Sequence, residues 1–184
     1  MKKKYSLVTG CAGFIGSHMV DLLLKKKHIV FGIDNLTSGK IKNLKNAKIN
    51  ENFIFIKGDL GKVLNSKNIK KNIKKIDYVF HFAGHGELIP SIEKPLEYFK
   101  NNAYNTVKLL DFVGKNYDVK KFVYAASSSC YGVINGRTNE EGKINTEHPY
   151  AFSKYVGELA CMQWAKVFKI PTISIRIFNA YGPR

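Results

Sequence analysis

Cysteine and arginine are scarce in this sequence, and long apolar runs are absent. Its three cysteines, Cys11, Cys130 and Cys161, are scattered and have no Cys-x-x-Cys spacing. The odd number and wide scatter of these cysteines exclude a disulfide framework. They predict reduced thiols, a cytoplasmic location and no metal site. No apolar run approaches the roughly 18 residues of a membrane-spanning helix, and no signal-peptide core follows the basic start. We therefore expect no membrane partner.

The strong positive charge comes almost entirely from lysine. Lys and Arg number 30 against 14 for Asp and Glu, a formal net charge of +16, yet only Arg137, Arg176 and Arg184 are arginines. Proteins that bind nucleic acids favour arginine and interleave aromatic with basic residues. Because neither pattern occurs, we interpret the charge as biased residue usage and predict no nucleic-acid partner. The competing hypothesis, a basic nucleic-acid binder, predicts salt-sensitive binding to RNA or DNA.

Short apolar runs alternate with longer segments of helical period along all 184 residues. The pattern predicts strands at residues 7–8, 29–33, 53–56, 78–82, 121–126 and 172–178, and helices at 14–26, 95–115 and 149–168. Apolar strands that alternate with helices are typical of a parallel sheet covered on both faces. The sequence therefore predicts one α/β domain over residues 1–184, a doubly wound parallel sheet in three α/β/α layers.

A glycine-rich turn lies between the first predicted strand and the first helix. Gly10 permits the tight turn, Gly13 lets the backbone approach a diphosphate, and Gly16 lets the helix pack closely on the sheet. The N–H groups that open this helix, at Phe14 and Ile15, favour phosphate. The context indicates a dinucleotide site rather than a tight turn with incidental glycines.

Two carboxylates follow the second and third predicted strands. Asp34, 18 residues after Gly16, stands where a carboxylate accepts hydrogen bonds from the adenosine ribose. It would repel the 2′-phosphate of NADP, and Lys40 is the only candidate to compensate, so we predict NAD as the cofactor. Asp59 fits either the rim of the adenine site or the N-cap of the next helix, and both interpretations stay open.

Tyr150 and Lys154 stand four residues apart in a predicted helix, which places both side chains on one face. A phenol is a weak base at neutral pH, but a neighbouring ammonium favours its ionised form. Such a pair takes a proton from a sugar hydroxyl while hydride leaves the same carbon. Without the dinucleotide turn, the same spacing would indicate an ordinary surface helix.

These motifs resemble those of the extended short-chain dehydrogenase/reductase family, in its NAD-dependent epimerase/dehydratase branch. The matching segments, in family order, are residues 9–16, 34–36, 58–60, 81–84, 101–102, 127–132, 150–154 and 176–184. The resemblance is greatest to the UDP-glucose 4-epimerases. It implies an NAD-binding Rossmann fold, NAD and a nucleotide-sugar substrate, with a UDP-sugar favoured.

The resemblance also implies roles for individual residues. Tyr150 would be the general base, Lys154 would hold the nicotinamide ribose, and Ser127 would hydrogen-bond the substrate oxygen beside Tyr150. Ser128 and Asn179 would lie on the substrate side, Asn179 at the phosphates. Besides the residues already named, the implied cofactor contacts are Asn35, Leu60, Phe82, Ala83, Gly84 and Asn102, with His81 as a structural residue.

The residues after the fifth predicted strand bear on the reaction. Related dehydratases place an acid and a glutamate where this chain has Ser128 and Ser129, which cannot shuttle a proton near neutral pH. We therefore expect 4-epimerisation through a 4-keto intermediate, with transient hydride transfer to NAD. The alternatives are a dehydratase or reductase of the same family, or a non-catalytic NAD-binding module. Two positions depart from the 4-epimerase pattern, Gly86 in place of lysine and Asn105 in place of glycine.

In the family, the segment that matches residues 176–184 leads into a further lobe that closes over the sugar nucleotide. A closed, dry site is needed for efficient hydride transfer, so we expect residues 1–184 alone to bind NAD with weak or no turnover. The helices predicted from Pro95 and Pro149 correspond to those that pair in family dimers. A homodimer is the expected assembly.

Overall fold

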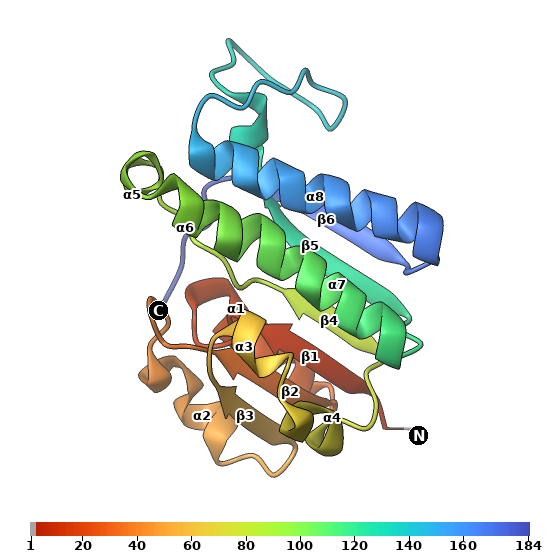
Figure 1. Cartoon of the computed structure of the whole chain (residues 1–184). Helices are drawn as coiled ribbons and strands as arrows, with labels where there is room; N and C mark the ends of the chain where they lie inside the picture. Colours follow the sequence, from red (N-terminus) through yellow and green to blue (C-terminus); the bar gives the residue numbers. More distant parts are fainter. Residues whose placement is uncertain (1–2) are drawn as a thin grey trace.

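A single parallel sheet organises the chain in the computed structural model, which describes residues 3–184 apart from the side chains at 67, 68 and 71 (Figure 1). Its six strands are hydrogen-bonded in the order β3-β2-β1-β4-β5-β6, all in parallel. The bounds are β1 Tyr5–Thr9, β2 Ile29–Asp34, β3 Phe53–Lys57, β4 Tyr78–His81, β5 Lys121–Ser127 and β6 Thr172–Ile177. The strand order reverses between β1 and β4, which confirms the predicted doubly wound sheet.

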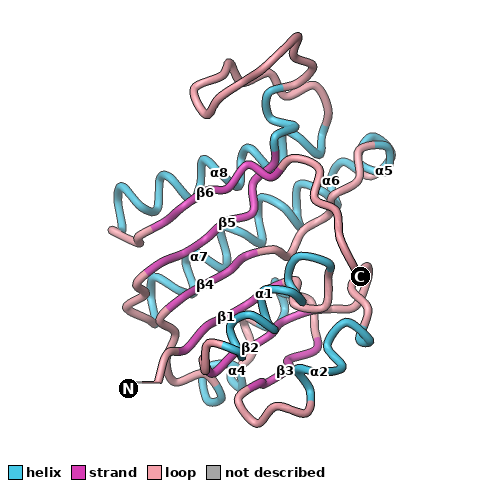
Figure 2. The backbone as a smooth tube through the Cα atoms, turned by 180° about the vertical axis from the view of Figure 1, so that it is seen from behind, coloured by secondary structure: helices cyan, strands magenta, loops and turns pink. Residues whose placement is uncertain are grey.

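Helices lie on both faces of this sheet. One face packs against α3 (Leu60–Val63), α4 (Lys67–Asn72), α7 (Asn105–Asn116) and α8 (Pro149–Phe168), which stand in front of the strands in Figure 1. The other face packs against α1 (Phe14–Lys25) and the short η1 (Ile41–Leu44) and α2 (Lys45–Lys48), near β1 to β3 (Figure 2). The remaining short helices are α5 (Ile89–Glu93), α6 (Pro95–Phe99) and η3 (Ser128–Tyr131).

Two apolar cores hold these layers together. Leu109, Leu110 and Phe122 are fully buried in the larger core, between the sheet and α7. His81 is also fully buried and hydrogen-bonds Thr9 Oγ1 at 2.6 Å and Thr106 Oγ1 at 2.9 Å. Burial lowers the pKa of His81 to about 3, so the ring is neutral at physiological pH. This agrees with a structural role.

The helix expected over residues 95–115 differs from a regular α-helix. Between α6 and α7 the chain takes a π-helical turn, η2, at Lys100–Tyr104. Inside this turn the Asn102 carbonyl accepts a hydrogen bond of 2.6 Å from Thr106 Oγ1, and Asn101 Nδ2 donates to the Glu97 carbonyl at 3.0 Å. Such turns are frequent at functional sites, and apolar periodicity does not reveal them.

None of the helices within residues 3–184 is long and apolar enough to cross a membrane. Over the same residues no group of three or more His, Cys, Asp or Glu is placed to hold a metal ion.

Candidate functional site

A cleft lies at the carboxyl ends of the strands, at the point between β1 and β4 where the strand order reverses. Of the residues predicted to bind the cofactor, its lining includes Gly10, Gly13, Asp34, Asn35, Asp59, Leu60, Phe82, Ala83 and Gly84. It also includes Ile33, Thr37, Ser38, Gly39, Gly58, His85, Asn101 and Asn105, which were not predicted as contacts. Gly58 and Asn101 lie inside the segments that carry the family resemblance, so the resemblance could have identified them as cleft residues. Their residue types alone could not.

The turn after β1 has the shape that an anion requires. Gly10 has a φ of +66°, and a Cβ there would lie 2.7 Å from the backbone nitrogen of Ala83. A Cβ on Gly16 would overlap the carbonyl of Gly10, so only glycine permits this crossing. Gly13 caps α1 without a side-chain hydrogen bond, and the first turn has no acidic residue. The opening N–H groups of α1, at Phe14 and Ile15, therefore have no side-chain cap, although neither residue nor Gly16 is in the cleft lining.

Asp34 lies at the end of β2 and is 8% exposed. Its carboxylate accepts hydrogen bonds from the backbone N–H groups of Ala12 at 2.9 Å and Leu36 at 2.8 Å. A Cβ on Gly39 would lie 2.8 Å from Asp34 Oδ1, which explains the glycine there. Each carboxylate oxygen can accept a further hydrogen bond. Asp34 is therefore fixed at the cleft wall with acceptor capacity to spare.

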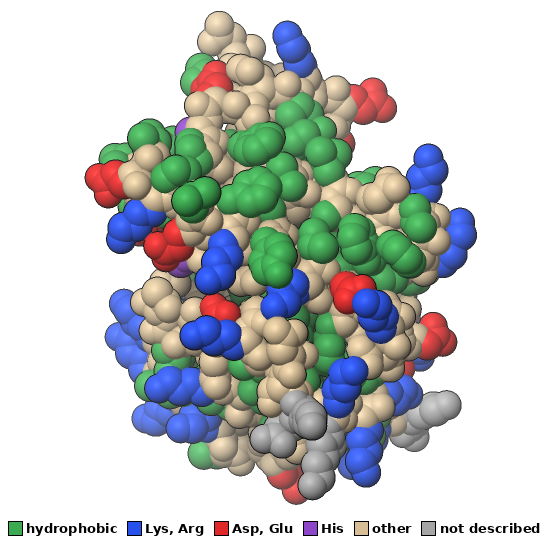
Figure 3. Space-filling view, in the orientation of Figure 1, with side chains coloured by type: hydrophobic (Ala, Val, Ile, Leu, Met, Phe, Trp, Pro, Cys, Tyr) green, Lys and Arg blue, Asp and Glu red, His purple; other side chains and the backbone are tan. Residues whose placement is uncertain are grey.

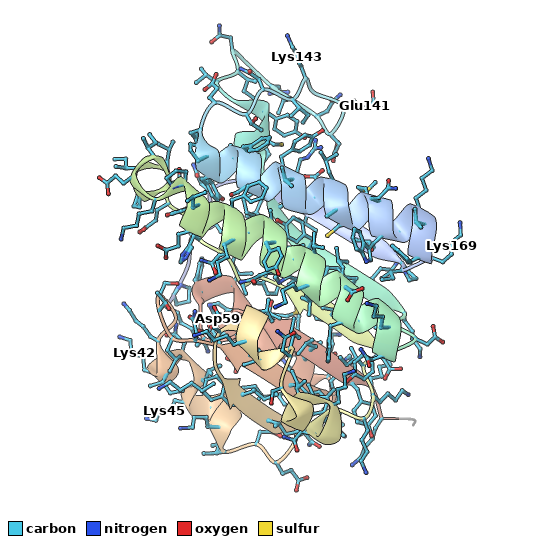
Figure 4. The ribbon with its side chains drawn as sticks, in the orientation of Figure 1. Lys42, Lys45, Asp59, Glu141, Lys143 and Lys169 are labelled. Atoms are coloured by element: carbon cyan, nitrogen blue, oxygen red, sulfur yellow. The ribbon has the colours of Figure 1, made fainter. Side chains whose placement is uncertain are left out.

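Asp59 combines the two interpretations left open above. It is the N-cap of α3, where its carboxylate accepts a hydrogen bond of 3.2 Å from the Lys62 N–H, and it also lines the cleft. Figure 4 shows Asp59 at the start of α3, whereas Lys42 and Lys45 lie at the outer edge of the molecule.

Ser127 and Tyr150 contact each other, although neither they nor Lys154 belong to the cleft lining. Ser127 ends β5 and Tyr150 stands in the first turn of α8, and the phenol donates a hydrogen bond of 3.1 Å to Ser127 Oγ. One turn further along α8, the Lys154 ammonium lies 4.6 Å from the centre of the Tyr124 ring. It lies 3.9 Å from the position that a Cβ on Gly84 would take. Burial lowers the pKa of Lys154 to about 8, although Cys161 and Glu158 act in the opposite direction.

Asn102 is buried and uses its amide to hold the loop after β4. Its Oδ1 accepts from the His85 N–H at 2.7 Å, and its Nδ2 donates to the His85 carbonyl and to Ser153 Oγ, both at 3.0 Å. The side chain therefore ties the loop to α8. Asn102 was expected to contact the cofactor but does not line the cleft. It holds the loop after β4, whose residues do line the cleft.

The two residues expected on the substrate side lie outside the cleft lining. Ser128 opens η3 directly after Ser127. Asn179 is exposed, in a segment that runs back to α1, where the Pro183 carbonyl lies 2.8 Å from His18 Nε2. The structure thus brings Ser127, Tyr150 and Lys154 together and leaves Asn179 apart.

A buried ion pair links α8 to β6, and the sequence analysis did not foresee it. Arg176 donates to Glu158 through Nε at 3.1 Å and through a terminal nitrogen at 2.8 Å. Its other terminal nitrogen donates to Tyr131 Oη at 2.7 Å and to the Glu140 carbonyl at 2.9 Å. These hydrogen bonds raise the pKa of Arg176 further above its ordinary value. The pair fixes the helix that carries Tyr150 and Lys154.

The parallel sheet carries a glycine turn after β1, an acid at the end of β2 and a Tyr-x-x-x-Lys pair whose tyrosine contacts a serine. These features define a dinucleotide-binding protein of the short-chain dehydrogenase/reductase type. The family model described as GDP-mannose 4,6 dehydratase matches residues 7–184. The chain belongs to this NAD-dependent epimerase/dehydratase family.

Several relatives cover nearly the whole chain. A putative UDP-glucose 4-epimerase from Methanocaldococcus jannaschii is 36% identical over 97% of this chain and 56% of its own length. The structure of a UDP-N-acetylglucosamine 4-epimerase from Methanobrevibacter ruminantium M1 is 37% identical, with a TM-score of 0.89, over 100% of this chain and 57% of that chain. A UDP-glucuronic acid 4-epimerase from Bacillus cereus, solved with NAD, is 33% identical, with a TM-score of 0.88, over 98% and 58%. The chain thus spans little more than half of these relatives.

Proposed function

We propose that this chain carries the cofactor site and the catalytic groups of an NAD-dependent 4-epimerase that acts on a UDP-sugar. The observation that carries the proposal is the contact of 3.1 Å between Tyr150 Oη and Ser127 Oγ, one helical turn from the Lys154 ammonium that lies close to Gly84 of the cleft lining. Two hydroxyls at this distance can both hydrogen-bond one substrate oxygen. The relatives described above include 4-epimerases for several UDP-sugars, which supports the substrate class without selecting the sugar.

The side chains divide the work of the reaction between them. NAD, when bound, supplies a reversible hydride acceptor. Tyr150 takes the proton of the sugar C4 hydroxyl, while Ser127 holds the same oxygen and stabilises the developing carbonyl. The Lys154 ammonium lies 3.9 Å from the position that a Cβ on Gly84 of the cleft lining would take, where it would hold the nicotinamide ribose. Once the 4-keto sugar has turned in the site, Tyr150 would return the proton to the same oxygen.

NAD fits the cleft better than NADP. The Asp34 carboxylate lines the cleft, where it would accept hydrogen bonds from the adenosine ribose, and the cleft lining of the described chain contains no lysine or arginine that could neutralise a 2′-phosphate. The relative from Bacillus cereus was solved with NAD, which supports the same choice. A cytoplasmic location is consistent with the three buried, free cysteines.

A dehydratase is the second candidate because the matching family model is described as a dehydratase. Elimination of water from a 4-keto sugar needs an acid and a base beside the leaving hydroxyl. The residues after β5 are Ser128 and Ser129, whose hydroxyls do not titrate near neutral pH. This composition favours epimerisation.

The test uses residues 1–184 with NAD and a panel of UDP-sugars, with products separated by chromatography and mass. We expect NAD binding and slow formation of the 4-epimer, with Tyr150→Phe lowering the rate at least about 100-fold while NAD still binds. Tyr104→Phe removes a phenol that is 54% exposed and outside the cleft lining, and is the matched control. A product lighter by one water would establish the dehydratase, and a conversion rate that Tyr150→Phe leaves unchanged would refute the role proposed for Tyr150.

We also propose that the protein forms a homodimer through α6 and α8. Both helices expose large apolar side chains, which form the green surface in the upper part of Figure 3. They include Leu96 at 86%, Phe152 at 50% and Met162 at 55% exposure. A contiguous apolar surface of this kind marks a protein interface. Light scattering should give twice the mass of the chain, and Phe152→Glu should give a monomer.

A further inference from the structure

The buried ammonium of Lys154 lacks the carboxylate partner that a buried cation ordinarily has. The residue is 7% exposed, and among the residues that the structure describes no acidic side chain forms an ion pair with it. Glu158, one turn further along α8, is paired with Arg176 instead. Because an unpaired buried charge is costly, the contact that does hold this ammonium matters for what Lys154 can do.

That contact is the face of the Tyr124 ring. Lys154 Nζ lies over the ring, 4.6 Å from its centre. The π electrons of an aromatic face attract a cation at this distance, and the attraction is larger where water is excluded. Tyr124 is 1% exposed, so its ring meets the ammonium inside the protein rather than at the surface.

The Tyr124 ring is itself fixed under α8. Its Oη donates a hydrogen bond of 3.2 Å to the Lys154 carbonyl and lies 3.5 Å from the Asn102 carbonyl. A Cβ on Gly157 would overlap the same Oη, so the glycine lets α8 pack directly on the tyrosine. One side chain therefore holds Lys154 twice, the backbone through its hydroxyl and the ammonium through its ring.

Burial brings the pKa of Lys154 down to about 8, close to the physiological range. The titratable groups around Lys154 are His81 on β4, Tyr124 on β5, Arg176 on β6, Tyr150, Glu158 and Cys161 on α8, and Tyr98 of α6, which packs on Tyr150. His81 is neutral, and Arg176 offsets the charge of Glu158. A modest attraction from the ring is therefore enough to decide whether the amine is charged near neutral pH.

We propose that Tyr124 is a positioning residue for the reaction, because the face of its ring holds the Lys154 amine in place and in its charged form. This rests on the proposed function, in which Lys154, close to Gly84 of the cleft lining, holds the nicotinamide ribose. An ammonium that is already oriented needs little reorganisation to donate hydrogen bonds to a ribose hydroxyl. Charged donors also form stronger hydrogen bonds than neutral ones.

The test changes the electrons of the ring and keeps its shape. Tyr124→Phe retains the aromatic face and serves as the reference, while pentafluorophenylalanine at position 124 presents an electron-poor face that repels a cation. Titration of the lysine ¹³Cε resonances measures the protonation of Lys154 in the folded chain, and the signal is identified by its loss in Lys154→Met. We expect the fluorinated ring to raise the acid dissociation constant of the ammonium about tenfold relative to Tyr124→Phe. NAD affinity at about pH 8 should fall with it.

Pentafluorophenylalanine in place of Phe122 is the matched control. Phe122 is a fully buried ring two residues earlier on β5, and the cation–ring contacts of the described residues do not include it. This variant should leave the titration of Lys154 unchanged. Equal dissociation constants for the two rings at position 124, or an equal change caused by the fluorinated ring at position 122, would overturn the assignment. The titration needs no cofactor, so a failure of the proposed function shows separately, as a chain that titrates as expected but binds no NAD.

Discussion

Replacement of Lys154 by methionine should make the unliganded chain more stable and bind NAD less well. Burial lowers the pKa of Lys154 from its ordinary value of 10.5 to about 8. Between these values the unfolded chain binds more protons than the folded chain, so the free energy of unfolding rises as the pH rises through this window. At pH 7 the lysine is charged in both states, and the shift corresponds to a cost of about 3 kcal/mol.

Methionine has a similar length and no charge to desolvate. We therefore expect Lys154→Met to raise the free energy of unfolding at pH 7 by about 2–3 kcal/mol, and this gain to shrink as the pH approaches about 10. Urea unfolding followed through Trp164, the single tryptophan, measures both values. Lys115→Met is the control, because its ammonium is 72% exposed and its loss should change stability by less than about 0.5 kcal/mol. Equal or lower stability of Lys154→Met at pH 7 would refute the reasoning.

Three further predictions concern the frame of the site. Glu158→Gln should destabilise the chain by about 3 kcal/mol in urea unfolding because it leaves the Arg176 guanidinium without its carboxylate, whereas a paired apolar replacement of both residues should cost less. Gly16→Ala should lose at least about 2 kcal/mol of stability and most NAD affinity, because its Cβ meets the Gly10 carbonyl; unchanged melting would contradict this. Asp34→Asn should raise the affinity for NADP relative to NAD about tenfold in competitive titration, because the carboxylate no longer repels the 2′-phosphate.

The six strands and the long helices could be predicted from the sequence because each has a local signal, whereas short helices such as α2, α4 and α5 were not predicted. Residues 29–33 and 121–126 are predicted as strands and form β2 and β5, and the glycine turn lies between β1 and α1 as expected. Strands, helices and tight turns depend on residues that are near one another in the sequence, so apolar periodicity and glycine positions predict them. The order of the strands was not predicted and comes from the structure.

The parts that the sequence did not predict depend on contacts between distant residues. The pair formed by Glu158 and Arg176 joins a helix to a strand 18 residues later. The contact between His85 and Glu97 depends on the π-helical turn at residues 100–104 and on the hydrogen bonds of Asn102. No periodic pattern specifies such contacts, because each arises only once the surrounding elements are packed. The contact between Tyr150 and Ser127 was implied by the family resemblance, and the structure adds its distance of 3.1 Å.

One strand has a consequence for handling the purified chain. In the described structure β6 is hydrogen-bonded to β5 and to no strand on its other side, and Ile173 and Ile175 are each 46% exposed. An uncovered edge with apolar residues invites strands from other molecules to add to it. Concentrated solutions should therefore grow turbid with time, and a lysine at position 175 should slow that aggregation by placing a charge where an incoming strand would align.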